Sequence, residues 1–342
     1  PFNLRSSPVY VSASVGITLY PDDGETTEIL LRNADQAMYT AKKEGRNRYY
    51  YFTSAMQDQV NRRTRIISEM RLALRSSQFH VVYQPVVDLR TGRIVKAEAL
   101  VRWHHPLDGP ISPALFIPLA EEAGLIAALG NQVFRDAIQM AKRFIAVQPG
   151  FMVSINKSPA QFDSKDHGWL EILKESGLDG GSFTVEITEG LLLDMRNAVQ
   201  KQLQDLRDAG LQIALDDFGT GYSSLAYLKK VDINYLKIDQ SFVRNLVQDR
   251  QDQVLCDAMI TMAHRLGMLV IAEGVETDGQ LTLLRQFGCD FGQGYLFSKA
   301  VSGEEVLAML EEQGVEAPRG AGEGAPGRSA GPVPGEGSGT SA

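Results

Sequence analysis

Between residues 79 and 296 the chain repeats one pattern, in which a short and largely apolar run ends in a polar or charged residue. Residues 94–97 lead to Glu98, for example, and residues 269–272 lead to Glu273. The polar residues that end such runs are Glu98, Asn156, Glu186, Asp216, Asp217, Lys237 and Glu273. Short apolar runs that alternate with helical segments predict an α/β protein with parallel strands.

The predicted strands and helices alternate along this region. We expect eight strands, near residues 79–87, 94–103, 151–156, 183–187, 211–215, 235–238, 268–272 and 290–296. We expect helices near residues 113–127, 130–146, 168–176, 195–209, 241–247, 250–266, 278–287 and 303–313. Eight strands suffice to close a TIM-type (β/α)₈ barrel. An open doubly wound sheet would bind a ligand at one switch point and would not spread polar groups over so many strand ends.

Closing the barrel would bring the polar strand ends to one face, because parallel strands share a C-terminal side. The face would then carry five carboxylates, one amide and one amine. Carboxylates this close raise one another's pKa unless cations intervene, and Lys237 supplies only one positive charge. We therefore expect divalent metal, and oxygen ligands favour Mg²⁺ or Mn²⁺ over zinc. The adjacent Asp216 and Asp217 suggest two ions, roughly 4 Å apart, as in sites that hydrolyse phosphate esters.

Composition narrows the classes of partner. The chain has 342 residues, of which 44% are hydrophobic and 22% charged, with a net charge of −8 and no basic run. We therefore expect no DNA or RNA partner, although a small anionic ligand held by metal ions is compatible with this charge. No apolar stretch approaches the roughly 20 residues of a membrane span, and no signal peptide is recognisable, so we expect a cytoplasmic protein without membrane contact. Cys256 and Cys289 are expected to be reduced core thiols.

Both ends differ from the central region. The chain begins at Pro1 without methionine, which suggests a piece of a longer protein. We expect a strand at 11–19, a helix at 27–44 capped by Gly45, a strand at 47–52 and a second helix at 58–76. Residues 316–342 are nearly all Gly, Ala, Pro, Ser and Glu, a composition that predicts disorder.

Several strings in the central region carry a family resemblance. They are Tyr83-Gln84-Pro85, Glu98-Ala99-Leu100, Ser154-Ile155-Asn156, Glu186-Ile187-Thr188-Glu189, Asp216-Asp217-Phe218-Gly219-Thr220-Gly221, Leu236-Lys237-Ile238-Asp239, Ala272-Glu273-Gly274-Val275-Glu276 and Gln293-Gly294-Tyr295. In this order they resemble the EAL family of cyclic di-GMP phosphodiesterases, over residues 63–312. The resemblance implies a modified barrel whose first strand is antiparallel, and a homodimer through the barrel.

The resemblance also implies a role for each site residue. The first metal ion would be held by Glu98, Asn156, Glu186 and Asp216, and the second by Asp216, Asp217 and Glu273. Lys237 would orient the attacking water, whose pKa shared coordination lowers, and Glu273 could accept its proton. Substrate contacts fall to Gln84, Arg102, Asp239 and Gln293. Glu189 and Glu276 would hold the loop that follows Asp217 and the edge of the site.

The first 52 residues resemble the C-terminal half of a GGDEF, or diguanylate cyclase, domain. The strings are Ser14-Val15-Gly16-Ile17, Ala34-Asp35-Gln36-Ala37-Met38-Tyr39 and Ala41-Lys42-Lys43-Glu44-Gly45-Arg46-Asn47. The half that would hold the catalytic turn is absent, so we expect no synthesis of cyclic dinucleotides. The expected organisation is a GGDEF half at 1–54, an entry helix at 55–78, the barrel at 79–315 and a tail at 316–342. The parent protein would be bacterial and could carry an upstream sensory or membrane region.

These observations predict hydrolysis of cyclic di-GMP to linear pGpG in second-messenger signalling. One alternative is a receptor that binds cyclic di-GMP without cleaving it, although every expected metal-binding residue is present. A second is an enolase-like barrel, which would need a capping domain that the sequence does not contain. Three side chains stay outside these roles. His104 and His105 are expected to have a loop or packing role and not to bind metal, and the charge of Lys157 beside Asn156 has no interpretation from sequence.

Overall fold

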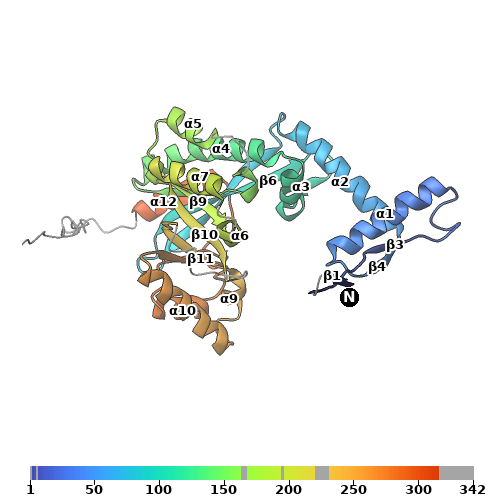
Figure 1. Ribbon diagram of the computed structural model, residues 1–342. Coiled ribbons are helices and arrows are strands. Elements are labelled where there is room, and N and C mark those ends of the chain that lie inside the picture. Colours follow the sequence, from blue (N-terminus) through green and yellow to red (C-terminus); the bar gives the residue numbers. More distant parts are fainter. Residues whose placement is uncertain (1, 5–6, 163–167, 194–195, 220–230, 316–342) are drawn as a thin grey trace, which may run out of the picture.

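The computed structural model describes residues 2–4, 7–162, 168–193, 196–219 and 231–315. Figure 1 shows a small N-terminal unit, a long connecting helix α2 (Ser54–Ala73) and a larger barrel. Residues 316–342, for which we predict disorder, lie outside the described residues. Most of the loop after Asp217 lies outside them as well. Within them, no helix combines the length and the hydropathy needed to cross a membrane.

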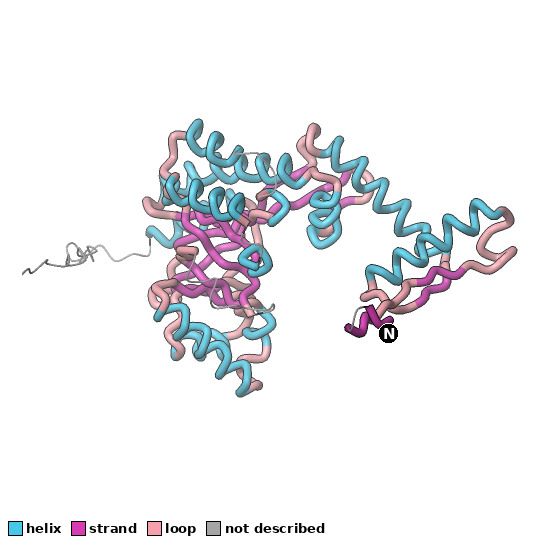
Figure 2. Tube along the Cα trace, in the orientation of Figure 1, coloured by secondary structure: helices cyan, strands magenta, loops and turns pink. Residues whose placement is uncertain are grey.

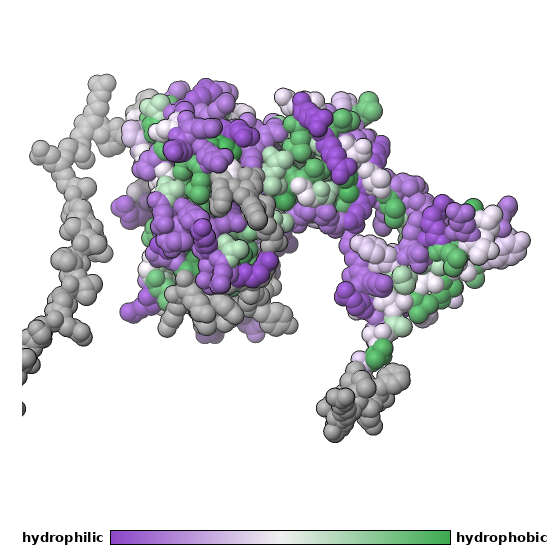
Figure 3. All heavy atoms as spheres, turned by 45° about the horizontal axis from the view of Figure 1, so that its top comes forward, coloured by the Kyte–Doolittle hydropathy of each residue, from purple (hydrophilic) through white to green (hydrophobic). Residues whose placement is uncertain are grey.

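The N-terminal unit packs one helix on short strands. Its elements are β1 (Phe2–Leu4), β2 (Ser7–Val9), β3 (Val15–Ile17), α1 (Thr27–Lys43) and β4 (Tyr49–Tyr51). Helix α1 begins where the Thr26 hydroxyl accepts the Ile29 N–H, and Gly45 follows its end with φ +106°. Strands β3 and β4 pair in parallel but are shorter than expected. Apolar side chains such as Val15 and Leu31 stay exposed, and green patches mark this unit in Figure 3.

The barrel wall is one closed sheet, drawn in magenta in Figure 2. Its strands are β5 (Phe79–Asp88), β6 (Ile94–His105), β7 (Gly109–Ile111), β8 (Met152–Asn156), β9 (Phe183–Thr188), β10 (Gln212–Phe218), β11 (Tyr235–Ile238), β12 (Leu269–Ala272) and β13 (Phe291–Gly292). The nine strands run in the order β5-β13-β12-β11-β10-β9-β8-β6-β7, and pairing of β5 with β6 closes the ring. Because β7 is an outer edge strand, eight of these described strands form the wall. Strand β5 is antiparallel to both neighbours, which confirms the modified barrel.

Helices cover the outside of this wall. They are α3 (Pro113–Glu122), α4 (Ile126–Val147), α5 (Gly168–Ser176), α6 (Glu189–Leu193), α7 (Asn197–Asp208), α9 (Gln240–Arg244), α10 (Arg250–Arg265), α11 (Asp278–Gln286) and α12 (Gly303–Val315), with short 3₁₀ turns η1 (Pro159–Gln161) and η2 (Gly180–Ser182). The main hydrophobic core lies between these helices and the strands, where rings such as Phe134 and Trp169 stack. A second, smaller cluster fills the barrel interior, around Val86, Ala214, Tyr235 and Ile271.

Among the barrel strands the last one departs most from expectation, since it covers two residues rather than 290–296. After Gly292 the backbone turns to pair with the loop that follows β12, where Gln293 O accepts the Val275 N–H at 3.0 Å. Gly294 permits this turn because a Cβ there would lie 2.2 Å from Val275 O. The backbone thus leaves the sheet because Gly294 lets two loops meet closely.

Candidate functional site

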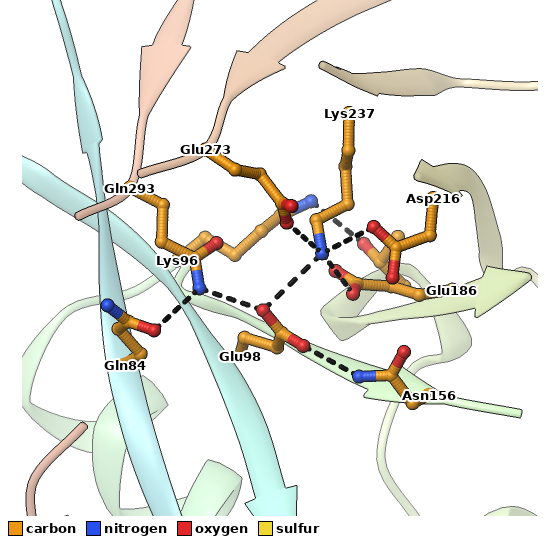
Figure 4. Close-up of polar contacts among 10 residues, drawn as sticks. Gln84, Lys96, Glu98, Asn156, Glu186, Asp216, Lys237, Glu273 and Gln293 are labelled. Carbon is orange, nitrogen blue, oxygen red and sulfur yellow. Dashed lines mark hydrogen bonds and ion pairs between the residues drawn. The ribbon is translucent and has the colours of Figure 1, made fainter. Parts of the chain in front are cut away.

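Lys237 lies at the centre of the strand ends, where its ammonium group faces four carboxylates (Figure 4). Its Nζ is 2.6 Å from Glu186, 2.7 Å from Glu273, 3.0 Å from Asp216 and 3.4 Å from Glu98. The Lys237 side chain is 1% exposed. One buried cation therefore has four acidic neighbours, which leaves a large excess of negative charge.

Each of these side chains points inward because of its place on a strand. Side chains alternate between the two faces of a strand, so one residue at each C-terminal end enters the barrel opening. Glu98 lies on β6, Glu186 on β9, and Lys237 on β11. Glu273 directly follows β12, and its N–H still donates to Ile238 O at 3.1 Å. The structure thus brings together side chains that are up to 175 residues apart, from Glu98 to Glu273.

Two amide side chains hold Glu98 in place, and a third contacts one of these two. Asn156 Nδ2 donates to Glu98 Oε1 at 2.6 Å, and Gln293 Nε2 donates to Oε2 at 2.8 Å. Gln293 Nε2 also lies 3.2 Å from Gln84 Oε1, and Gln84 in turn donates to Ser298 O at 3.3 Å. Gln84 and Gln293 therefore lie beside the acidic cluster, where sequence motifs place substrate contacts. Gln293 donates to Glu98 directly, and Gln84 accepts a hydrogen bond from Gln293.

Asp217 owes its position to an irregular backbone. Consecutive strand residues point to opposite faces, yet Asp216, Asp217 and Glu273 offer carboxylate oxygens within 4.8 Å of one another. The register of β10 against β11 shifts between Leu215 and Phe218, and Asp217 has φ +54°. This left-handed conformation is uncommon for a residue other than glycine, although Asp tolerates it better than most. The bulge turns a second carboxylate towards the site.

Burial and neighbouring groups raise the pKa of some carboxyl groups in the site and lower that of another. Burial and the nearby Glu98 raise the pKa of Glu186 well above its usual value, despite its contact with Lys237. Burial also acts to raise the pKa of Glu98, but Lys237 and the amides of Gln293 and Asn156 outweigh it and lower that pKa. Burial raises the pKa of Glu273 to about 7, with Asp216 and Glu98 adding to the rise. The raised pKa values of Glu186 and Glu273 mean that added positive charge, from a proton or a metal ion, would stabilise the site.

The donor chemistry fits divalent metal. The groups that converge around Lys237 offer carboxylate oxygens, and the oxygen of the Asn156 amide adds a neutral donor. Asp216 Oδ1 is buried, and its described partner is Nζ of Lys237, in an ion pair at 3.0 Å. Such hard oxygen donors match Mg²⁺ and Mn²⁺. Asp216 lies next to both Lys237 and the Asp217–Glu273 pair.

The remaining predicted site residues lie at the edges. Arg102 is half-buried on β6 and donates to the Val101 carbonyl at 2.9 Å. Asp239 caps helix α9 by accepting the Ser241 N–H at 2.9 Å, and Glu276 is exposed. Glu189 is buried and accepts the Gly219 N–H at 3.3 Å, the first described contact of the loop after Asp217.

Two side chains without an assigned role turn away from the site. His105 is buried, and its Nδ1 accepts the Asp108 N–H at 3.1 Å, in agreement with the expected packing role. Lys157 extends over the Trp169 ring, with Nζ 4.4 Å from the ring centroid. Its charge therefore faces the helical layer.

One buried cation was missed by the sequence reasoning. Lys96 stands within a run that looked like an ordinary apolar strand, yet its side chain enters the barrel interior and is 4% exposed. Its position two residues before Glu98 is the only sequence signal, since residues two apart on a strand share a face. Burial lowers the pKa of Lys96 to about 7, although Glu186 acts in the opposite direction.

Glu273 predicts a pH-dependent stability in the absence of metal. Its pKa is raised from 4.5 to about 7 on folding, so the neutral form stabilises the fold below about pH 4.5 and that contribution is lost as the pH rises towards 7. We expect the Glu273→Gln variant to gain melting temperature relative to the parent as the pH rises from 5 to 8. Circular dichroism melting in EDTA measures this.

Glu276→Gln is the control, because Glu276 is exposed three residues further along the chain. Its melting temperature should follow the parent at every pH. A constant difference between parent and Glu273→Gln at both pH values would contradict the raised pKa.

The comparisons with known proteins concern the family and the fold of this chain. A sequence model of the protein family described as "EAL domain" matches residues 67–300, and one described as "Diguanylate cyclase, GGDEF domain" matches residues 1–48. The chain is similar to the bifunctional diguanylate cyclase/cyclic di-GMP phosphodiesterase MucR of Pseudomonas aeruginosa, with 36% identity over 91% of this chain and 46% of MucR. It is also similar to the cyclic di-GMP phosphodiesterase NbdA of the same organism, with 37% identity over 91% of this chain and 40% of NbdA.

The chain therefore spans less than half the length of these curated relatives. Among solved structures, it resembles the PaMucR phosphodiesterase in complex with c-di-GMP, with 33% identity and a TM-score of 0.67 over 71% of this chain and 99% of that one. The EAL domain of Mycobacterium smegmatis DcpA is 36% identical, with a TM-score of 0.58 over 68% of this chain and 98% of that one.

Proposed function

Because this chain belongs to the EAL domain family, we propose that it hydrolyses the phosphodiester bond of cyclic di-GMP. The observation that carries the proposal is the complete set of acidic strand ends around Lys237, in a chain 36% and 37% identical to relatives that are named cyclic di-GMP phosphodiesterases. A solved relative that binds cyclic di-GMP shares the fold.

The proposed cofactors are two divalent ions, Mg²⁺ or Mn²⁺. Glu98, Asn156, Glu186 and Asp216 would hold one ion, and Asp216, Asp217 and Glu273 the other. The donor chemistry and the bulge at Asp217 support this division. When bound, such ions offset phosphoryl charge and lower the pKa of water towards neutrality. They also offset the excess of carboxylates around Lys237.

The protein's own side chains perform the remaining tasks. Lys237 is placed to donate a hydrogen bond to the attacking water and so to orient it. The Glu273 carboxylate, which lies 2.7 Å from Lys237 Nζ, would accept a proton from that water. The Arg102 guanidinium would bind a substrate phosphate from the edge of the site, since its forked donors match phosphate oxygens. The proposed product of a single cleavage is linear pGpG.

A turnover assay with controlled metal tests this function. We expect the EDTA-treated protein to leave cyclic di-GMP intact, and addition of Mg²⁺ or Mn²⁺ to restore its conversion into pGpG. Without metal ions, Lys237 alone cannot offset the charge of the carboxylates, which would then repel the substrate phosphates. Chromatography with mass detection identifies the product. Ca²⁺ serves as the control cation, because it is larger than Mg²⁺ and accepts more flexible coordination geometries. Binding of cyclic di-GMP without product in Mg²⁺ and Mn²⁺ would favour the receptor alternative.

The proposed assembly is a homodimer formed through the barrel, with the loop after Asp217 near the interface. The contact between Glu189 and the Gly219 N–H supports a link between this loop and the site. We also retain the proposed organisation of a GGDEF half at 1–54, an entry helix at 55–78 and the catalytic barrel at 79–315. The two family matches agree with the order of these parts.

A further inference from the structure

A second layer of inward-facing side chains lies directly beneath the acidic site. Each of its members stands two residues before a site residue, because strand residues two apart share a face. The members are Lys96, Ser154, Thr184, Ala214, Tyr235 and Ile271, beneath Glu98, Asn156, Glu186, Asp216, Lys237 and Glu273 respectively. Layers of this kind are the normal filling of a barrel. A lysine within one is unusual.

Lys96 makes contacts across the barrel. Its Nζ donates to Thr184 Oγ1 at 2.9 Å and lies 3.5 Å from the centroid of the Tyr235 ring. Thr184 is 0% exposed and Tyr235 is 6% exposed, so water cannot replace these contacts readily. Figure 4 draws Lys96 together with the site residues above it.

These contacts join strands that are not neighbours. Lys96 is on β6, Thr184 on β9 and Tyr235 on β11, while the sheet order places β8 between β6 and β9, and β10 between β9 and β11. The same three strands carry Glu98, Glu186 and Lys237, whose mutual distances define the centre of the site. One side chain therefore ties together the three strands that must stay in register.

We propose that Lys96 is a positioning residue that braces β6, β9 and β11 and thereby holds the metal-binding carboxylates at their spacing. The inference rests on the proposed function, both for turnover and for the metal ions that the carboxylates would hold. An apolar side chain of similar length could fill the same volume, but it could not hydrogen-bond Thr184. The hydrogen bond to Thr184 holds in either protonation state, because both the ammonium group and the neutral amine donate to a hydroxyl, whereas the contact with the Tyr235 ring is strongest for the ammonium form.

The test compares variants of the whole chain in Mn²⁺ binding, followed by electron paramagnetic resonance, and in steady-state turnover of cyclic di-GMP. Lys96→Met removes the donor, and Thr184→Val removes the acceptor without changing charge. We expect each to weaken Mn²⁺ binding by about 10-fold and to lower kcat by a similar factor, as outer-shell changes do. KM should stay within about 2-fold, since substrate lies on the other side of the carboxylates.

Three further variants separate positioning from packing. The double variant Lys96→Met/Thr184→Val should bind Mn²⁺ no more weakly than Lys96→Met alone, because both changes break one contact. Thr184→Ser keeps the hydroxyl and should retain parental affinity within about 2-fold. Ser154→Ala is the matched control, because the Ser154 hydroxyl is buried in the same layer without a hydrogen-bond partner in the described structure.

The proposal fails if Lys96→Met keeps parental Mn²⁺ affinity, or if the two single effects add in the double variant. It also fails if Lys96→Met binds Mn²⁺ more tightly, because that result would assign Lys96 a purely electrostatic effect. Should Lys96→Met not fold, Thr184→Val and Thr184→Ser decide alone. A parent that binds Mn²⁺ but yields no product would overturn the proposed function, while the Mn²⁺ affinities would still decide the brace.

Discussion

Replacing Lys237 with methionine is expected to abolish turnover and to destabilise the metal-free protein by about 3 to 5 kcal/mol, the usual cost of removing one partner from a buried ion pair. Nζ of Lys237 is the one described cation within 3.4 Å of all four carboxylates. Without it, buried negative charges face one another, and protonation of the carboxylates would relieve only part of the cost.

The activity effect has a separate cause. Lys237 is placed to orient the attacking water, and loss of such an oriented donor lowers rates by about 100-fold or more. Turnover of Lys237→Met should therefore stay at least about 100-fold below that of the parent at saturating Mn²⁺. Mn²⁺ should nevertheless raise the melting temperature of the variant more than that of the parent, because the added cations replace the missing positive charge.

Chemical unfolding in EDTA and in Mn²⁺ measures the stability effect. Lys201→Met is the matched control, because Lys201 is exposed on α7. Its stability and turnover should equal those of the parent. A metal-free Lys237→Met protein as stable as the parent would show that the four carboxylates do not depend on this cation.

Glu98→Gln and Glu186→Gln are expected to lose turnover alike but to change stability in opposite directions. Both remove a proposed metal ligand, so kcat should fall by about 100-fold or more in each. The charged form of Glu98 is stabilised, with a lowered pKa, so its neutral substitute should destabilise the metal-free protein at pH 7. The amide nitrogen that Glu98→Gln introduces would also face one of the two donors, Asn156 Nδ2 or Gln293 Nε2.

Glu186 has the opposite balance. Its pKa is raised, so the charged form is disfavoured on folding, and a neutral amide should leave stability unchanged or increase it at pH 7. Melting temperatures of both variants in EDTA at pH 7 test this contrast. Below about pH 4 the difference between the two variants should shrink, because the parent carboxyls of the unfolded chain are then protonated as well. Equal shifts of both variants at pH 7 would contradict the assignment.

Much of the fold could be predicted from local patterns. Apolar runs at 183–187 and 269–272 form strands within a residue of their expected ends, because buried parallel strands need continuous apolar faces. The two-residue length of strand β13 could not be predicted, because its end depends on a contact between Gly294 and the Val275 backbone. The bulge at Asp217 was equally hidden, since two adjacent acids do not reveal which face each one takes.

The barrel and the set of groups at its mouth follow from the amino-acid sequence alone, because apolar runs that alternate with helical segments predict parallel strands. The antiparallel direction of β5 was implied only by the family resemblance. Glu98, Glu186 and Lys237 belong to the groups that this alternation places there. The four carboxylate contacts of Lys237, and the position of Lys96 beneath them, emerge only in the folded chain. Those contacts join strands separated by up to 139 residues between Glu98 and Lys237, and distances of that kind arise only when the ring of strands closes.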